Sequence, residues 1–319
     1  MSRRVMAGTS KHQIHVVFEQ NKEATCSMRD SVWTDTGIEQ EALHACFTSL
    51  NQLVGIDQVK KFIKEIYAWL EIGKRRREAG LLTEQQVLHM IFTGNPGTGK
   101  TTVARILSTL LKEMGVLSKG HLVEVERADL VGEYIGHTAQ KTREHVQKAL
   151  GGILFIDEAY SLARGGDKDF GREAIDTMVK AMEDFKNEFV LILAGYSNEM
   201  ECFLNTNPGL PSRFPIQLRF PNFDLEQLMQ ITMQMVGERE YCLSSSANNK
   251  IRIHLRKQMD GNFGNARYIR NMIEQAIRQH AVRILRHPGP SRSELMTLRG
   301  EDFQFESLKE KNKVPTWYN

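Results

Sequence analysis

The sequence predicts an α/β fold in which a mostly parallel sheet lies between helices, followed by a small all-helical unit. Short apolar runs alternate with helical patterns through the middle of the chain, which is the order that a parallel sheet requires. Two of these runs, Ile153–Ile156 and Phe189–Ala194, are apolar throughout, as strands covered on both faces are. After Pro221 the strand patterns stop and helical spacing takes over.

The individual elements follow from apolar periodicity. From Ile56 to Leu70, apolar side chains recur at steps of three and four, which is the spacing of one helix face. Strands are expected at Val87–Phe92, His121–Val125, Ile153–Ile156, Phe189–Ala194 and Ile216–Phe220. Helices are expected at about residues 100–113, 139–149, 172–186, 245–259 and 266–285, with another beginning near Leu225.

These patterns divide the chain into three parts. Residues 1–40 form an N-terminal extension, in which alternation over residues 14–18 predicts one short strand. Residues 41–221 form the α/β domain, and residues 222–319 form a helical lid domain with a polar C-terminal tail that is expected to be peripheral.

Composition narrows the class of protein. The 319 residues are 41% hydrophobic and 25% charged, as in soluble globular proteins. The net charge of +3 is too small to attract nucleic acid over the whole surface. No apolar run reaches the ~20 residues of a membrane span, and the N-terminus lacks a secretory signal. Four scattered cysteines, Cys26, Cys46, Cys202 and Cys242, suggest free thiols, so we expect a cytoplasmic protein.

The strongest functional signal is the segment GNPGTGKT, which matches the phosphate-binding pattern G-x-x-x-x-G-K-[ST] between an expected strand and an expected helix. Its glycines let backbone N–H groups point at phosphates, and the helix N-terminus adds positive potential. Lys100 is expected to bind the β- and γ-phosphates, and the Thr101 hydroxyl to coordinate Mg²⁺. The predicted nucleotide-binding residues here are Gly94, Asn95, Pro96, Gly97, Thr98, Gly99, Lys100, Thr101 and Thr102.

Two adjacent carboxylates, Asp157 and Glu158, end the apolar run Ile153–Ile156. A buried strand is a costly place for two anions, which favours a functional role. Asp157 is suited to hold Mg²⁺, and Glu158 can polarise an attacking water, as hydrolysis requires. We therefore predict a P-loop NTPase that hydrolyses ATP with Mg²⁺, in which Lys100 and Glu158 are catalytic.

These motifs resemble those of the CbbX-like branch of the AAA+ ATPases over about residues 50–285. Gly195-Tyr196, Asn207–Phe214 and Asn265–Arg267 belong to the same set of motifs. Within that branch, Val131–Arg143 looks most like the members from spore-forming bacilli, and the red-type Rubisco activases are similar. The resemblance therefore implies an AAA+ core with a helical lid.

The resemblance also implies roles for particular residues. The Val54–Gly55 pair would hold the adenine, and Arg267 would be the sensor-2 arginine that links the lid to the nucleotide. Arg213 would be a catalytic arginine finger that reaches the γ-phosphate of a neighbouring subunit. The sensor-1 residue stays open between Ser197 and Asn198, because Gly195-Tyr196 precedes them where other members often carry Asn.

A finger that acts on a neighbour requires a second subunit, so the resemblance implies a homo-oligomeric ring, with a hexamer as the expected size. It also places Tyr134, Ile135 and Gly136 on a pore loop that grips polypeptide. An aromatic ring can contact any side chain, and Gly lets a loop swing. Tyr134 could instead be a core aromatic, but its polar neighbours favour an exposed loop.

Two functions of different classes remain open at this stage. One is a ring motor that remodels a protein client through its pore, with sporulation as the setting that the resemblance suggests. The other is a nucleotide-gated module on DNA, like a clamp loader or an initiator, in which the basic run Lys74–Arg77 binds phosphates. The pore aromatic and the small net charge favour the motor, so nucleic acid is not the expected partner. The client and any small-molecule effector cannot be read from the residues.

Overall fold

The computed structural model describes residues 41–83, 87–134, 136–164, 170–206, 209–259 and 263–305. The expected N-terminal extension, with its strand, and Ile135 of the expected pore loop lie outside the described residues. By their contacts, the residues group into two compact units. The second unit gathers Asn51–Lys60, Gly94–Lys100 and the chain from Phe220 on, and the first holds the rest.

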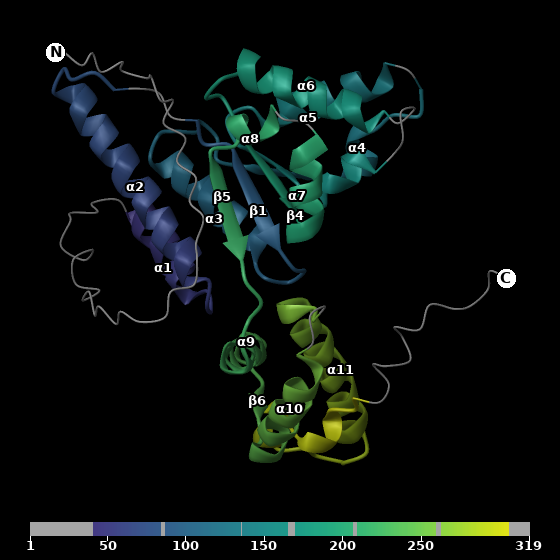
Figure 1. Ribbon diagram of the computed structural model, residues 1–319. Helices are drawn as coiled ribbons and strands as arrows, with labels where there is room; N and C mark the ends of the chain where they lie inside the picture. The colour runs from purple at the N-terminus through teal and green to yellow at the C-terminus, as the bar shows by residue number, and fades with distance from the viewer. Residues whose placement is uncertain are drawn as a thin grey trace, which may run out of the picture. The chain divides into compact units, whose positions relative to one another are not determined.

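The first unit is built on a five-stranded sheet with the order β2-β3-β4-β1-β5 (Figure 1). The strands are β1 (Met90–Gly94), β2 (Leu122–Val125), β3 (Ile153–Ile156), β4 (Val190–Gly195) and β5 (Ile216–Phe220). They confirm the five strands expected from the sequence. β4 pairs in parallel with both β1 and β3. The register sets Thr93 opposite Gly195 and Ile156 opposite Leu193, so β1 and β3 end at the same edge of the sheet.

Helices cover the sheet because its strands are apolar on both faces. Leu154 and Leu191 point to one face and pack with Val146 of α5 and Met178 of α6, while Phe155 is buried on the other face. The helices α5 and α6 lie side by side in Figure 1. The helical elements before Phe220 are α1 (Glu41–Gln52), α2 (Asp57–Glu78), α3 (Lys100–Glu113), α4 (Arg127–Leu130), α5 (His137–Ala149), η2 (Ala159–Ala163), α6 (Gly171–Asp184), α7 (Ser197–Thr206) and α8 (Leu210–Arg213).

The basic run Lys74–Arg77 ends the long helix α2. The positive charges therefore lie where a helix dipole is negative, and Arg75 Nε also donates to Glu71 Oε1 at 2.9 Å. The run therefore lies where basic residues are favourable for the helix itself. Over the described residues, no helix is both long enough and apolar enough to cross a bilayer.

The residues from Phe220 on form a helical unit, as the sequence predicts. Asp224 begins its first helix with a capping box, in which its side chain accepts from the Gln227 N–H and the Gln227 side chain accepts from the Asp224 N–H. The elements are α9 (Leu225–Gly237), β6 (Cys242–Leu243), α10 (Ser245–Gln258), α11 (Asn265–Leu285), α12 (Arg292–Met296), β7 (Thr297–Leu298) and η3 (Gly300–Asp302).

Two details of this unit differ from the sequence-based expectation. The two-residue strands β6 and β7 pair in parallel, although strand patterns stop at Pro221. The segment 286–305, the described part of the chain after α11, is also not wholly peripheral, because Leu298 and Phe303 are buried. A bidentate ion pair from Arg283 of α11 to Asp302, with atoms 2.8 and 2.9 Å apart, holds this segment. The sequence interpretation missed it because the segment is polar overall and its few anchors are isolated.

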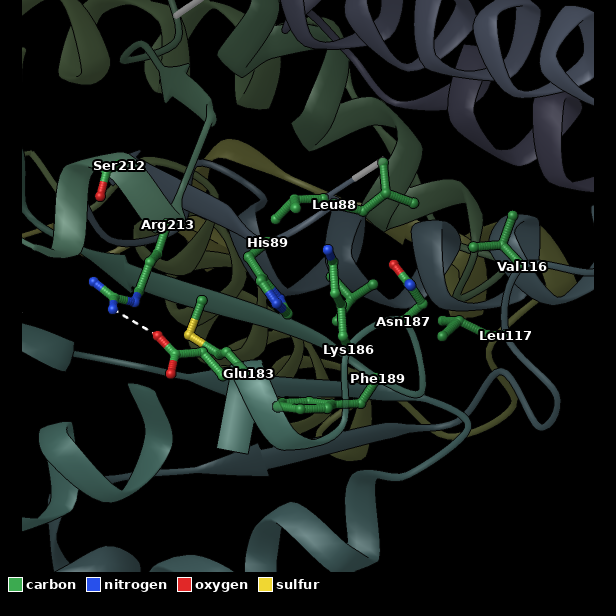
Figure 2. A pocket seen from close by; sticks show the side chains of 13 residues that line it. Leu88, His89, Val116, Leu117, Glu183, Lys186, Asn187, Phe189, Ser212 and Arg213 are labelled. Atoms are coloured by element: carbon green, nitrogen blue, oxygen red, sulfur yellow. Dashed lines mark hydrogen bonds and ion pairs between the residues drawn. The ribbon is translucent and has the colours of Figure 1, made fainter. Parts of the chain in front are cut away.

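His89, directly before β1, is a buried titratable group with a defined partner. It lines a cavity of about 530 Å³ in the first unit (Figure 2). Its Nδ1 accepts a hydrogen bond from the Leu191 N–H at 3.0 Å, which requires an unprotonated Nδ1. Burial lowers the pKa of His89 from 6.5 to about 4. The folded chain therefore keeps the ring neutral where an unfolded chain would protonate it.

We expect His89 to make the stability of the fold depend on pH. Below pH 6.5 the unfolded chain takes up a proton that the folded chain refuses, so stability falls as the pH drops from about 6.5 towards 4. Between pH 7 and pH 5, the wild type should lose about 2 kcal/mol more than His89→Gln, which keeps an acceptor without the titration. Urea unfolding of both proteins at pH 7 and pH 5 measures these losses of unfolding free energy. Equal losses in the two proteins would contradict the assignment.

Candidate nucleotide site

The phosphate-binding segment forms a compact loop between β1, which ends at Gly94, and α3, which begins at Lys100. Lys100 Nζ donates to the carbonyl oxygens of Gly94 and Asn95, at 2.8 and 3.0 Å. Thr98, which is fully buried, donates its hydroxyl to the same Asn95 oxygen at 2.8 Å. The ammonium group is thus held at the loop, where phosphate oxygens would be alternative and stronger acceptors.

Gly97 lies where the loop meets the start of α11, and it has a φ of +70°. A Cβ atom at this position would lie 2.5 Å from the Gly264 oxygen and 2.7 Å from the Arg267 nitrogen. The Ala266 N–H donates to the Gly97 oxygen at 3.1 Å. The loop and the first turn of α11 therefore touch backbone to backbone, which only glycine permits.

Three of the segments predicted to bind nucleotide belong to the second unit. They are the Val54–Gly55 pair, the loop Gly94–Lys100 and Arg267. Gly55 has a φ of +63° and packs against the amide of Gln227, from which an added Cβ would be 3.0 Å away. Arg267 is exposed in the first turn of α11. The structure thus brings the expected adenine segment, phosphate loop and sensor-2 arginine into one compact unit.

The two carboxylates follow β3, which has the bounds expected from the sequence, but they are not both buried as the sequence interpretation assumed. β3 ends at Ile156, Asp157 is half-buried and Glu158 is exposed. The cost of burying two anions is therefore avoided, and that argument for their function does not hold. The position of the two carboxylates at the end of a strand still favours a functional role. Asp157 continues the strand by donating its N–H to the Val125 oxygen at 3.1 Å, and its Oδ1 accepts from the Glu158 N–H at 3.0 Å.

The backbone at Glu158 supports a specific orientation of this residue. Its φ is +49°, a left-handed value that is uncommon outside glycine, asparagine and aspartate. Such local strain persists where the surroundings fix it, and it clusters at functional sites. The buried η2 turn after it, in which Tyr160 is 4% exposed, provides that support. Desolvation, together with the Glu158 carboxylate, raises the pKa of Tyr160 to about 12 and keeps it neutral.

The predicted Mg²⁺ ligands, Thr101 and Asp157, both belong to the first unit. Asp157 leaves the sheet at the edge where β1 also ends, and Thr101 is in the first turn of the helix that follows β1. A hydroxyl and a carboxylate are hard oxygen ligands of the kind that Mg²⁺ prefers, so the donor set fits this ion.

Arg213, the predicted finger, ends the short helix α8 (Figure 2). Its guanidinium forms an ion pair with Glu183 Oε1 of α6 at 2.6 Å and donates to the Gly209 oxygen at 2.9 Å. The side chain is 35% exposed. The structure therefore shows Arg213 bonded within its own chain, and the sequence alone did not reveal Glu183 as its partner.

Tyr134 is 66% exposed, so it is not a core side chain. Its ring makes an edge contact with His137, with centroids 5.4 Å apart. Gly136, with a φ of +84° and open space around it, begins α5 directly after this loop. The two sensor-1 candidates, Ser197 and Asn198, start α7 at the end of β4, and nothing in the structure separates them.

Two asparagines to which sequence reasoning gave no role of their own, Asn222 and Asn265, bond to the loop Gly94–Lys100 and to each other. Asn265 is the first residue of the Asn265–Arg267 motif, but only Arg267 was given a role from the sequence. Asn222 gave no signal beyond its place next to Pro221.

We expect Gly97→Ala to destabilise the protein more than Gly99→Ala. Both positions have a left-handed φ, which costs roughly 1 kcal/mol in each variant. Only at Gly97 does the added methyl also collide with backbone, adding roughly 1–3 kcal/mol, since an added methyl at Gly99 meets nothing within 4 Å. Thermal unfolding of the two variants checks the difference. Equal melting temperatures would mean that the loop does not pack on α11 in solution.

Family models match both the part of the chain that forms the sheet and the helical part that follows it. The family model for the ATPase family associated with various cellular activities matches residues 90–222, and the AAA lid domain model matches residues 224–313. A point mutant of RuvB from Thermotoga maritima is 20% identical and superposes with a TM-score of 0.51 over 77% of this chain and 70% of its own, which supports the fold alone.

Curated relatives are much more similar. Stage V sporulation protein K of Bacillus subtilis (strain 168) is 50% identical over 97% of this chain and 98% of its own length. The chloroplastic ribulose bisphosphate carboxylase/oxygenase activase of Cyanidioschyzon merolae is 42% identical over 79% of this chain and 87% of its own length. Protein CbbX of Cereibacter sphaeroides is 44% identical over 73% and 76%. The chain belongs to the CbbX-like branch of the AAA+ ATPases, and it is an ATP-hydrolysing enzyme with an AAA lid domain.

Proposed function

We propose that the protein is a ring-forming motor that uses Mg²⁺ and ATP to remodel a protein client through a central pore. The exposed Tyr134 carries this proposal, because its ring lies on the loop before α5 and is open to contact with a polypeptide rather than packed in a core. The similarity to a sporulation protein and to a Rubisco activase supports a protein client, and the former suggests sporulation as the setting.

Within this proposal, each residue has a chemical role. The backbone of Gly94–Gly99 and the ammonium group of Lys100 would bind the phosphates, and the Val54–Gly55 pair the adenine. Thr101 and Asp157 would hold Mg²⁺, which supplies charge neutralisation on the β- and γ-phosphates when bound. Glu158 would accept a proton from the attacking water. We also propose residues 41–221 and 222–319 as the two functional domains.

Arg213 would act on the nucleotide of a neighbouring subunit, which makes a ring necessary for activity. A guanidinium group neutralises charge that develops on the transferred phosphoryl group. In the isolated chain the same group pairs with Glu183, a partly exposed carboxylate, and such a pair costs little to exchange. The expected ring size is six.

The alternative, a nucleotide-gated module on DNA, rests on Lys74–Arg77. These residues end α2, and the partner of Arg75 there is Glu71. An acidic partner weakens a phosphate-binding role, and the small net charge of the chain adds nothing to it. Stimulation of ATP hydrolysis by duplex DNA, steeply reduced by salt, would favour this alternative over the motor.

We expect Lys100→Ala and Glu158→Gln to separate binding from hydrolysis. Lys100→Ala should lose nucleotide binding, because it removes the cation at the phosphate loop. Glu158→Gln should bind ATP normally and lower kcat by roughly 10²-fold or more, because only the proton acceptor is changed. Fluorescent-nucleotide binding and phosphate release measure the two steps. Normal turnover by Glu158→Gln would remove this residue from its proposed role.

Tyr134→Ala should uncouple remodelling from hydrolysis. The truncation removes the grip on a client but no group that contacts phosphate or Mg²⁺, so basal ATPase activity and ring assembly should persist. Because the ring is 66% exposed, the melting temperature should change little, as for the control Trp69→Ala at another exposed aromatic of the same unit. The measurement is ATPase stimulation by an unfolded protein. Full stimulation of the Tyr134→Ala protein would contradict the pore-loop role.

A further inference from the structure

Three asparagine side chains connect the phosphate loop to the first turn of α11. Asn95, in the loop, donates its Nδ2 to Asn222 Oδ1 at 2.9 Å. Asn265, the first residue of α11, donates its Nδ2 to the same Asn222 Oδ1 at 3.0 Å. All three belong to the second unit, so the connection lies within one compact body.

Backbone partners fix the orientation of the Asn265 amide. Its Oδ1 accepts from the Phe223 N–H at 3.1 Å, so the Nδ2 must point the other way. That Nδ2 faces acceptors only, namely the Pro96 oxygen at 3.2 Å, the Phe263 oxygen at 3.0 Å and Asn222 Oδ1. Asn265 therefore binds the loop, the segment between β5 and α9, and the segment before α11 at once.

The free-energy cost of burying the Asn265 amide indicates that its hydrogen bonds are a specific feature of the fold. Asn265 is fully buried and has a φ of +47°, a left-handed conformation that asparagine tolerates better than most residues. Burying an amide is unfavourable unless its groups are bonded, and here both ends are. Asn222, by contrast, is exposed and serves both bonds as an acceptor through Oδ1.

We propose that Asn222 and Asn265 are positioning residues for nucleotide binding. Together with the Ala266–Gly97 bond, their amides hold the phosphate loop and the first turn of α11, which carries Arg267, in one fixed geometry. This proposal rests on the nucleotide site proposed above.

The first test uses Asn222→Ala, because the exposed position can lose its side chain without threatening the fold. Its KM for ATP should rise roughly two- to tenfold, the factor to which one or two net hydrogen bonds correspond. The melting temperature should match that of Asn249→Ala, a control at an exposed amide on α10 of the same unit. A KM equal to that of the control, or a rise in KM with a parallel fall in melting temperature, would overturn the proposal.

The second test uses the chemistry of the two amides. Asn222 acts as an acceptor, so Asn222→Asp should keep both bonds, whereas Asn265→Asp loses every bond that its Nδ2 donates. Hydrogen exchange of the Ala266 amide, measured without nucleotide, should be as slow in Asn222→Asp as in the wild type. It should be several-fold faster in Asn222→Ala and Asn265→Asp. Equal rates in all four proteins, or equal acceleration in Asn222→Asp and Asn265→Asp, would contradict the positioning role.

Failure of this inference can be told apart from failure of the proposed nucleotide site. If wild-type protein binds nucleotide and Lys100→Ala does not, the proposed nucleotide site stands. An unchanged KM for ATP in Asn222→Ala would then refute only the positioning role of the asparagines. If Lys100→Ala binds nucleotide as the wild type does, the proposed site is wrong, and the positioning role that rests on it is wrong as well.

Discussion

The architecture of this ATPase depends on a backbone contact between the phosphate loop and the start of α11. The Ala266 N–H bonds to the Gly97 oxygen, and the two chains approach so closely that a single Cβ at Gly97 would collide with backbone atoms. Because of this contact, Gly94–Lys100 groups with the lid even though β1 and α3 flank it. The loop is thus joined to β1 and α3 along the chain and to the lid by packing.

The parallel sheet is the second feature that determines where the candidate site residues lie. β1 and β3 both pair in parallel with β4, so the loop and the carboxylates Asp157 and Glu158 start from the same sheet edge. The strands are apolar on both faces, and their burial between helices fixes that edge. Polar groups are confined to the strand ends, where Asp157 is half-buried and Glu158 is exposed. Packing in the middle of the sheet therefore fixes the strand ends and leaves these two carboxylates at its rim, where they are not fully buried.

Local patterns in the sequence predicted the strands, the lid helices and the phosphate loop, because each depends on neighbouring residues. Contacts between distant segments could not be predicted in this way. The pairing of Arg213 with Glu183, the amide bonds of Asn265 and the anchoring of Phe303 join residues far apart in sequence, and no periodicity encodes them. The carboxylates show the same limit, because strand bounds that were predicted correctly did not reveal how exposed Asp157 and Glu158 are.

The contact between the phosphate loop and α11 is tested most directly by a structure of the Glu158→Gln protein with Mg²⁺ and ATP. We predict that phosphate lies against the loop Gly94–Lys100 and that the Ala266 nitrogen stays within hydrogen-bond distance of the Gly97 oxygen, as at its present 3.1 Å. Loop and lid would then move as one body during the ATPase cycle. A phosphate-bound loop separated from the first turn of α11 would contradict the account, because the lid would then respond to nucleotide independently of the loop.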